Sequence, residues 1–116
     1  MTTINISPGE ALKLWHRVAY RQVLDESPDL NIRQMAILLT IYLEPPPHTV
    51  RDLARKLNVT KPVITRALDT MGHMKLLERR PDERDRRSIV VRRTVEGTLY
   101  LEKLADLISQ TAAESS

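Results

Sequence analysis

Apolar residues recur at helical spacing near the start of the chain. Ser7 is followed three residues later by Glu10, with Pro8 between them, which is typical of a helix start. The pattern predicts a helix over residues 7–26, ended by the polar residues around Ser27. Its apolar positions are Ala11, Leu14, Trp15, Val18, Ala19 and Val23.

The end of the chain repeats this spacing. Leu101, Leu104, Ala105 and Ile108 form one apolar stripe, so we expect a second terminal helix over residues 95–113. The small polar tail from Thr111 onward is expected to fray.

Residues 31–43 are almost continuously apolar, with the run "MAILLTIYL" at their centre. A helix that is apolar on all sides is buried, so we expect this segment to form the centre of a domain. Glu44 and the prolines at 45–47 end it, because proline disfavours helix in the residue before it.

Two short helices are predicted next, joined by a turn at Asn58 and Val59. Thr49 with Asp52 forms a capping box for the first, and Thr60 is expected to cap the second, over residues 60–73. The second helix is apolar on one side and polar on the other. Such a pair is typical of a helix-turn-helix, although an ordinary helical hairpin has the same pattern. The polar side carries Lys61, Pro62, Thr65, Arg66 and Asp69.

The segments "LLERR" and "SIVVRR" each predict a short strand, with a loop at residues 81–87 between them. A hairpin directly after a recognition helix is a wing, here residues 79–93. We therefore predict a mainly α fold with a small β-hairpin, a winged helix-turn-helix, with helices at both termini that form a dimerisation part. The alternative for the wing is an ordinary solvated charged loop.

The charges are distributed unevenly along the chain. Residues 48–94 hold 13 Lys and Arg against 6 Asp and Glu, whereas the other residues hold 5 against 9. A basic segment of this kind indicates a face that meets a polyanion. We expect the acidic side chains of the wing, Asp82, Glu83 and Asp85, to pair with neighbouring arginines.

Other features limit the class of protein. Cysteine is absent, and neither a secretory signal nor a membrane span is evident, so we expect a cytoplasmic protein. His16, His48 and His73 have no metal-ligand spacing and are expected to be exposed or capping. No nucleophile, acid and base pair, or glycine-rich phosphate loop stands out, so we expect neither an enzyme nor a cofactor or metal site.

The runs "TVRDLARKLNVTKPVITRALDTM" and "LLERRPDERDRRSIVVRRTVEG" resemble the winged helix-turn-helix of the multiple-antibiotic-resistance regulator (MarR) family of bacterial transcription factors. The resemblance extends from about Leu30 to Gly97. It implies a homodimer that binds a pseudo-palindromic operator in double-stranded DNA, with one recognition helix in each major groove and wing arginines in the flanking minor grooves. It also implies regulation of transcription, with repression as the expected direction, and release of DNA by a small-molecule inducer.

Carried over position by position, the resemblance places DNA contacts in three segments. Arg66 suits bidentate pairing with guanine, and Arg87 is the expected minor-groove contact, oriented by Asp85. The full set of expected DNA-binding residues is Thr49, Thr60, Lys61, Pro62, Thr65, Arg66, Arg84, Asp85, Arg86 and Arg87.

The sequence departs from the family pattern at three places. Arg93 stands where an inward-facing apolar residue is usual, so it must find an acidic partner or extend to solvent. Lys75 replaces the glycine that usually ends the recognition helix. The chain is also short, with one helix after the wing in place of two. We therefore expect a dimer interface built from the first and last helices of each chain, with the members Leu14, Trp15, Val18, Leu101, Leu104 and Ile108.

Taken as a whole, residues 1–116 are expected to form a single domain, with residues 7–26 and 95–113 for dimerisation and 31–94 for DNA binding. Two other functions fit the same fold: a winged helix that binds a protein partner, and an architectural DNA binder without sequence preference. The operator sequence and the inducer cannot be read from the residues.

Overall fold

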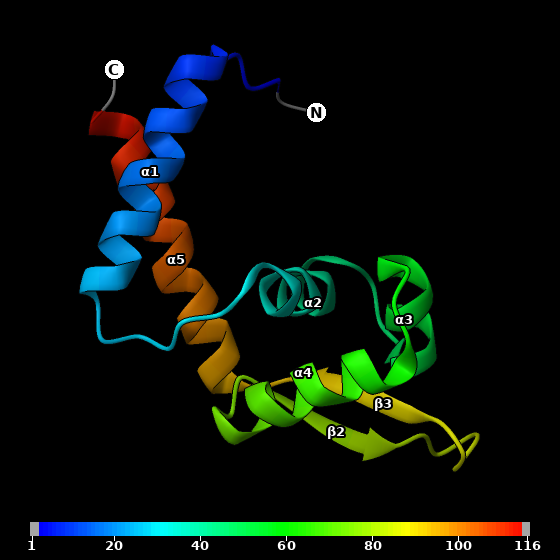
Figure 1. The fold of residues 1–116 in the computed structure, drawn as a ribbon. Coiled ribbons are helices and arrows are strands. Elements are labelled where there is room, and N and C mark those ends of the chain that lie inside the picture. The colour runs from blue at the N-terminus through cyan, green and yellow to red at the C-terminus, as the bar shows by residue number, and fades with distance from the viewer. Residues whose placement is uncertain (1–2, 115–116) are drawn as a thin grey trace. The chain divides into compact units, whose positions relative to one another are not determined.

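The computed structural model describes residues 3–114, which divide into two compact units. The central unit comprises Leu30–Tyr100. The terminal unit comprises the described parts of Met1–Asp29 and Leu101–Ser116. Figure 1 shows the elements along the chain.

The terminal unit consists of helix α1 (Pro8–Leu24) and the later part of helix α5 (Val95–Glu114). The Ser7 hydroxyl caps α1 by accepting from the Glu10 amide at 3.2 Å, as predicted. The predicted fraying is wrong for residues 111–114, because α5 continues to Glu114, and residues 115 and 116 lie outside the described residues. Thr111 is completely buried and accepts a hydrogen bond from Arg21 at 2.9 Å.

Two ion pairs join α1 and its following loop to α5 within the terminal unit, where the two helices lie side by side (Figure 1). Arg21 Nη2 lies 2.6 Å from Glu114 Oε2, and this hydrogen bond lowers the pKa of the Glu114 carboxyl. Lys103 Nζ lies 2.9 Å from Asp25 Oδ2. The hydrogen bond from the Ser27 hydroxyl, and then the bond from Lys103, lower the pKa of Asp25.

Helix α2 (Ile32–Leu43) forms the centre of the other unit, as its apolar sequence predicts. Asn31 and Gln34 cap its start reciprocally, each side chain bonded to the other residue's backbone amide. Ile37, Leu38 and Ile41 are at most 1% exposed. The unit also buries Leu53, Ile64, Leu68, Met71, Leu76, Leu77 and Val91.

A three-stranded antiparallel sheet completes the central unit, in the order β1-β3-β2. The predicted hairpin is confirmed, with strands β2 (Leu77–Pro81) and β3 (Ile89–Arg93) shifted slightly from the expected bounds. Strand β1 (His48–Thr49) was not predicted. Two residues after a run of prolines are too few to show an alternating pattern. His48 is buried, with Nε2 3.1 Å from the Glu44 carbonyl oxygen just after α2.

Tyr42 joins the sheet to the ends of two helices within the central unit. Its hydroxyl lies 2.9 Å from the Leu76 carbonyl oxygen and accepts from the Thr94 amide at 3.0 Å. The Thr94 hydroxyl donates to the Lys75 carbonyl and accepts from the amide of Gly97, which lies in the first turn of α5. A Cβ atom at Gly97 would overlap both the Tyr42 hydroxyl and the Leu76 carbonyl oxygen. This close approach explains why glycine stands at this position.

Candidate nucleic-acid interface

Helices α3 (Val50–Leu57) and α4 (Lys61–His73) form the predicted helix-turn-helix. Thr49 caps α3 by accepting from the Asp52 amide at 3.0 Å. The reciprocal half of the predicted capping box is not formed, because the Asp52 carboxylate accepts from Arg55 instead. Asn58 adopts the left-handed conformation, with φ 54°, and so allows the sharp turn between the helices.

The predicted side-chain cap at Thr60 is also wrong. Thr60 is the N-cap residue of α4, but its hydroxyl makes no capping hydrogen bond. The amides of Val63 and Ile64 bond to its carbonyl oxygen, and Pro62 has no amide hydrogen to cap. The exposed Thr60 hydroxyl therefore stands at the start of α4 without a capping role.

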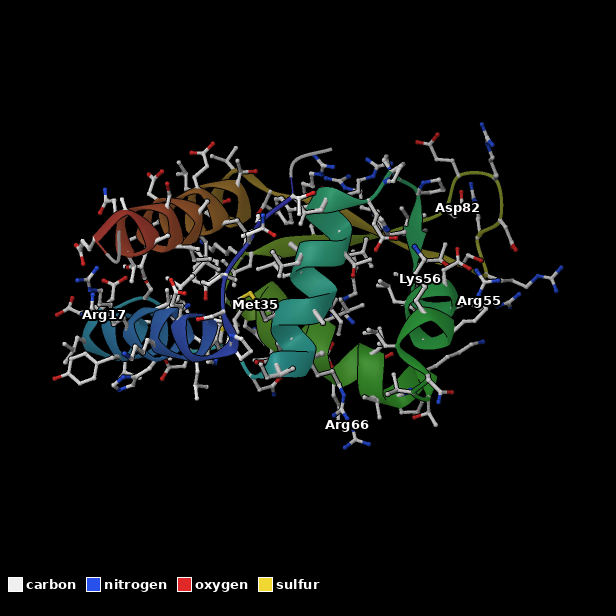
Figure 2. The ribbon with its side chains drawn as sticks, turned by 90° about the horizontal axis from the view of Figure 1, so that it is seen from above. Arg17, Met35, Arg55, Lys56, Arg66 and Asp82 are labelled. Atoms are coloured by element: carbon white, nitrogen blue, oxygen red, sulfur yellow. The ribbon has the colours of Figure 1, made fainter. Side chains whose placement is uncertain are left out.

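Helix α4 has the two faces that the sequence predicts. Ile64, Ala67, Leu68 and Met71 are buried in the central unit. The opposite side presents exposed polar and basic residues, and Arg66 extends away from the helix into solvent (Figure 2). The exposed residues that were predicted to contact DNA are Lys61, Pro62, Thr65 and Arg66.

The wing loop is held mainly by hydrogen bonds to its own backbone. Asp82 accepts from the Arg84 amide at 3.0 Å, and Asp85 accepts from the Arg87 amide at 3.1 Å. Ion pairing within the loop is weaker than expected, since Arg87 Nε lies 3.9 Å from Asp85 Oδ1. The Arg87 side chain is 97% exposed. The carboxylates therefore fix the loop backbone and leave the arginines extended into solvent.

One interaction of this surface was not predicted. Arg79 Nη2 on β2 lies 2.6 Å from Asp69 Oδ1 on α4. Asp69 lies on the exposed side of the helix, where an unpaired carboxylate would repel an approaching polyanion. The arginine thus neutralises the acid and ties the wing to the recognition helix. Only the packing of β2 beside α4 could have revealed this pair.

The two departures from the family pattern within this unit each have a structural solution. Lys75 adopts the left-handed conformation, with φ 63°, where the family usually has glycine. The Leu76 amide then bonds to the Met71 carbonyl, which closes α4. Arg93 has no acidic partner among the residues that the structure describes. Its Nε donates to the Ile41 carbonyl oxygen at 3.3 Å, and its guanidinium lies 5.7 Å from the Tyr42 ring centroid.

The residues expected at a dimer interface differ in exposure. Trp15 is 56% exposed and Ile108 39% exposed, whereas Val18 is already buried within the single chain. Leu14, Leu101 and Leu104 are half-buried. In residues 3–114 no group of His, Asp and Glu could hold a metal ion. None of the helices described there is long and apolar enough to span a membrane.

The helix-turn-helix, the adjoining three-stranded sheet and the arginine-bearing hairpin loop define a winged helix-turn-helix protein. The chain belongs to the MarR family, whose family model matches residues 30–89. The family consists of transcriptional regulators that bind DNA. A comparison with curated proteins finds no significant match.

Solved structures share the fold over most of their length. MarR from E. coli, as a mutant, is 27% identical over 97% of this chain and 83% of that chain, with a TM-score of 0.65. The chain in an S. aureus MepR–DNA complex is 20% identical, over 88% of this chain and 78% of that chain, with a TM-score of 0.70. The PcaV transcriptional regulator from Streptomyces coelicolor, solved with its natural ligand, is 22% identical, over 96% of this chain and 80% of that chain, with a TM-score of 0.64.

Proposed function

We propose that the protein is a dimeric repressor that binds a pseudo-palindromic operator in double-stranded DNA and acts in the cytoplasm. In each subunit α4 occupies the major groove, and the wing loop places Arg87 in the adjacent minor groove. The observation that carries this proposal is the exposed side of α4, with Lys61, Thr65 and Arg66, in the same compact unit as the extended wing arginines.

The polar groups at the helix starts are suited to the phosphate backbone. The exposed Thr60 hydroxyl and Lys61 stand at the start of α4, and Thr49 stands at the start of α3. Helix N-termini and hydroxyl groups commonly contact phosphates, which position a protein on DNA without specifying sequence. Arg84 and Arg86 on the wing also contact phosphates in this proposal. Base recognition then falls to Arg66, Thr65 and Pro62.

The terminal unit supplies the dimer interface in this proposal. Its exposed Trp15 and Ile108 and its half-buried leucines offer an apolar surface to a second copy. A dimer presents two recognition helices, which is why the operator is expected to be an inverted repeat with half-sites about one helical turn apart.

Regulation by a small molecule is part of the proposal. Among the relatives, S. aureus MepR has been solved with ethidium bromide and PcaV with its natural ligand. A ligand of this kind would release the protein from its operator. The residues that bind it are not assigned.

The test is a selection from fragmented genomic DNA at about 150 mM salt, where non-specific electrostatic binding is weak. The proposal predicts that an inverted repeat is enriched and that its affinity falls steeply with salt. A protein-interaction module would retain little DNA at any salt concentration. An architectural binder would retain DNA without a common sequence. The selection therefore separates all three functions.

A further inference from the structure

A shallow recess of about 220 Å³ lies between the start of α2 and one side of α4. Both walls belong to the central unit. The recess opens beside the recognition helix and does not involve the wing. Its lining consists of Asn31, Arg33, Gln34, Val63, Arg66, Ala67 and Thr70.

The charged groups of this recess all have the same sign. Arg33 and Arg66 are both exposed, and no carboxylate lines the recess. Within residues 3–114, neither guanidinium has a hydrogen-bond or ion-pair partner, whereas Arg79 nearby on β2 is paired with Asp69. Two unpaired guanidiniums on one recess favour an anion, because each presents five N–H donors and cannot lose its charge.

The side-chain oxygens of Asn31 and Gln34 and the hydroxyl of Thr70 already take part in hydrogen bonds. Asn31 and Gln34 bond to each other's backbone amides at 2.8 and 2.9 Å. The Thr70 hydroxyl donates to the Arg66 carbonyl oxygen at 3.2 Å. The arginines therefore supply the charged donors of the recess, and the side-chain NH2 groups of Asn31 and Gln34 can supply neutral ones to a bound anion.

The position of the recess identifies the anion. Val63, Arg66 and Thr70 are spaced three and four residues apart, so they share one side of α4, whereas Lys61 and Thr65 lie toward the other side. A helix in the major groove has a sugar–phosphate backbone along each side. One backbone must then run past the side of α4 that carries the recess.

We infer that Arg33 contacts a phosphate of the DNA strand beside the major groove, at a recess it shares with Arg66. This inference rests on the proposed function and adds α2 to the DNA-binding elements. It extends the contacted DNA beyond the bases that α4 reaches. Arg66, at the edge of the same recess, is then held in its orientation by the phosphate that Arg33 binds.

The experiment uses the whole chain of 116 residues and a duplex carrying the selected inverted repeat. Single phosphates are replaced one at a time by uncharged methylphosphonates, and binding of the wild type is compared with that of Arg33→Gln. The glutamine keeps part of the aliphatic stem and is well tolerated in helices. Arg17→Gln, at an exposed position of α1 in the terminal unit, makes the same change of charge and serves as the control.

Replacing any contacted phosphate should weaken binding of the wild type, and we expect one of these phosphates in each half-site, beside the recess, to be the one that Arg33 contacts, with a loss of about 3- to 10-fold. Arg33→Gln should bind the unmodified duplex more weakly by a similar factor and be insensitive to replacement of that phosphate. Its salt dependence should also fall by about one phosphate contact per subunit. The Arg17→Gln control should retain the wild-type pattern.

The inference is overturned if Arg33→Gln and wild type show the same affinity, the same salt dependence and the same sensitive phosphates. This result leaves the proposed function intact, because the wild type still binds its operator. If the wild type binds no inverted repeat, the proposed function fails and the inference fails with it. The two failures are therefore distinguishable.

Discussion

The two compact units of the chain differ in where their large apolar side chains lie. Among residues 3–114, every buried hydrophobic residue except Val18 belongs to the central unit, whose core is complete within one chain. The terminal unit leaves Leu12, Trp15, Val23 and other large side chains exposed. The central unit exposes arginines and hydroxyl groups on α4 and the wing, together with some apolar side chains such as Ile32 and Leu43, whereas the terminal unit exposes large apolar side chains and buries few.

This difference indicates two kinds of partner. A polar, basic surface over a finished core can bind a polyanion without first changing its own fold. Two helices with exposed apolar sides gain stability when a second copy covers them, since removing apolar surface from water is favourable. The comparison therefore predicts that substitutions in the terminal unit impair association of the subunits. Substitutions in the central unit should instead impair contact with DNA.

The largest effect is expected from a charge placed on the apolar surface of the terminal unit. Trp15→Glu should convert the dimer to a monomer, which light scattering measures as a halved mass. Operator affinity should fall on the order of 100- to 1000-fold, because the two half-sites are then bound independently.

Lys13→Gln is the matched control for this variant, since it makes the same change of charge at another exposed position of α1. It should remain dimeric and bind normally. A Trp15→Glu protein that stays dimeric at micromolar concentration would contradict the assignment of Trp15 to the interface.

A smaller effect, confined to the central unit, is expected at the wing. Arg87→Ala should weaken operator binding by roughly 1 to 3 kcal/mol, because it removes the guanidinium that the proposed complex places in the minor groove. The mass in light scattering should not change. Titration at fixed salt measures the loss, with Arg17→Ala in the terminal unit as control. Unchanged affinity of the Arg87 variant would refute the wing assignment.

A third variant set examines the pair between α4 and β2. Arg79→Ala leaves the Asp69 carboxylate unpaired beside the DNA and should lower operator affinity about 2- to 5-fold, in the range of a surface ion pair. Asp69→Ala combined with Arg79→Ala should restore part of this loss. A double variant no better than Arg79→Ala would show that Arg79 contacts DNA itself, rather than neutralising Asp69.

The smallest effect concerns pH and belongs to the terminal unit. The pKa values of Glu114 and Asp25 are lowered by their hydrogen bonds to Arg21 and to Ser27 and Lys103. Their contribution to stability is therefore complete above the ordinary carboxyl pKa of about 4 and is lost as the pH falls from there through the lower folded-state values.

Thermal unfolding measured between about pH 6 and pH 3 should thus show a slightly smaller acid loss for Glu114→Gln than for the wild type. Glu102→Gln, at another exposed position of α5, is the control. Identical pH profiles for Glu114→Gln and the wild type would mean that the Arg21 pair contributes nothing measurable.

Much of the fold follows from local sequence. The cap at Ser7, the apolar run of α2, the two faces of α4 and the hairpin were all predictable. Each depends on residues a few positions apart, because helix caps and helical faces are set by neighbours within one or two turns. The exposure of the polar residues of α4 and of the wing arginines was predictable for the same reason, since it follows from the pattern of neighbouring residues.

Other features depend on residues brought together by folding. Asp69 pairs with Arg79, Arg93 bonds to Ile41, Arg21 reaches the buried Thr111, and β1 exists only through pairing with β3. The recess beside Arg33 likewise joins two helices separated along the chain. A carboxylate or guanidinium looks the same in the sequence whether its partner is solvent, backbone or an opposite charge. The packing of helices and strands determines which of these partners each charged side chain has, because the packing sets which groups come within hydrogen-bonding distance.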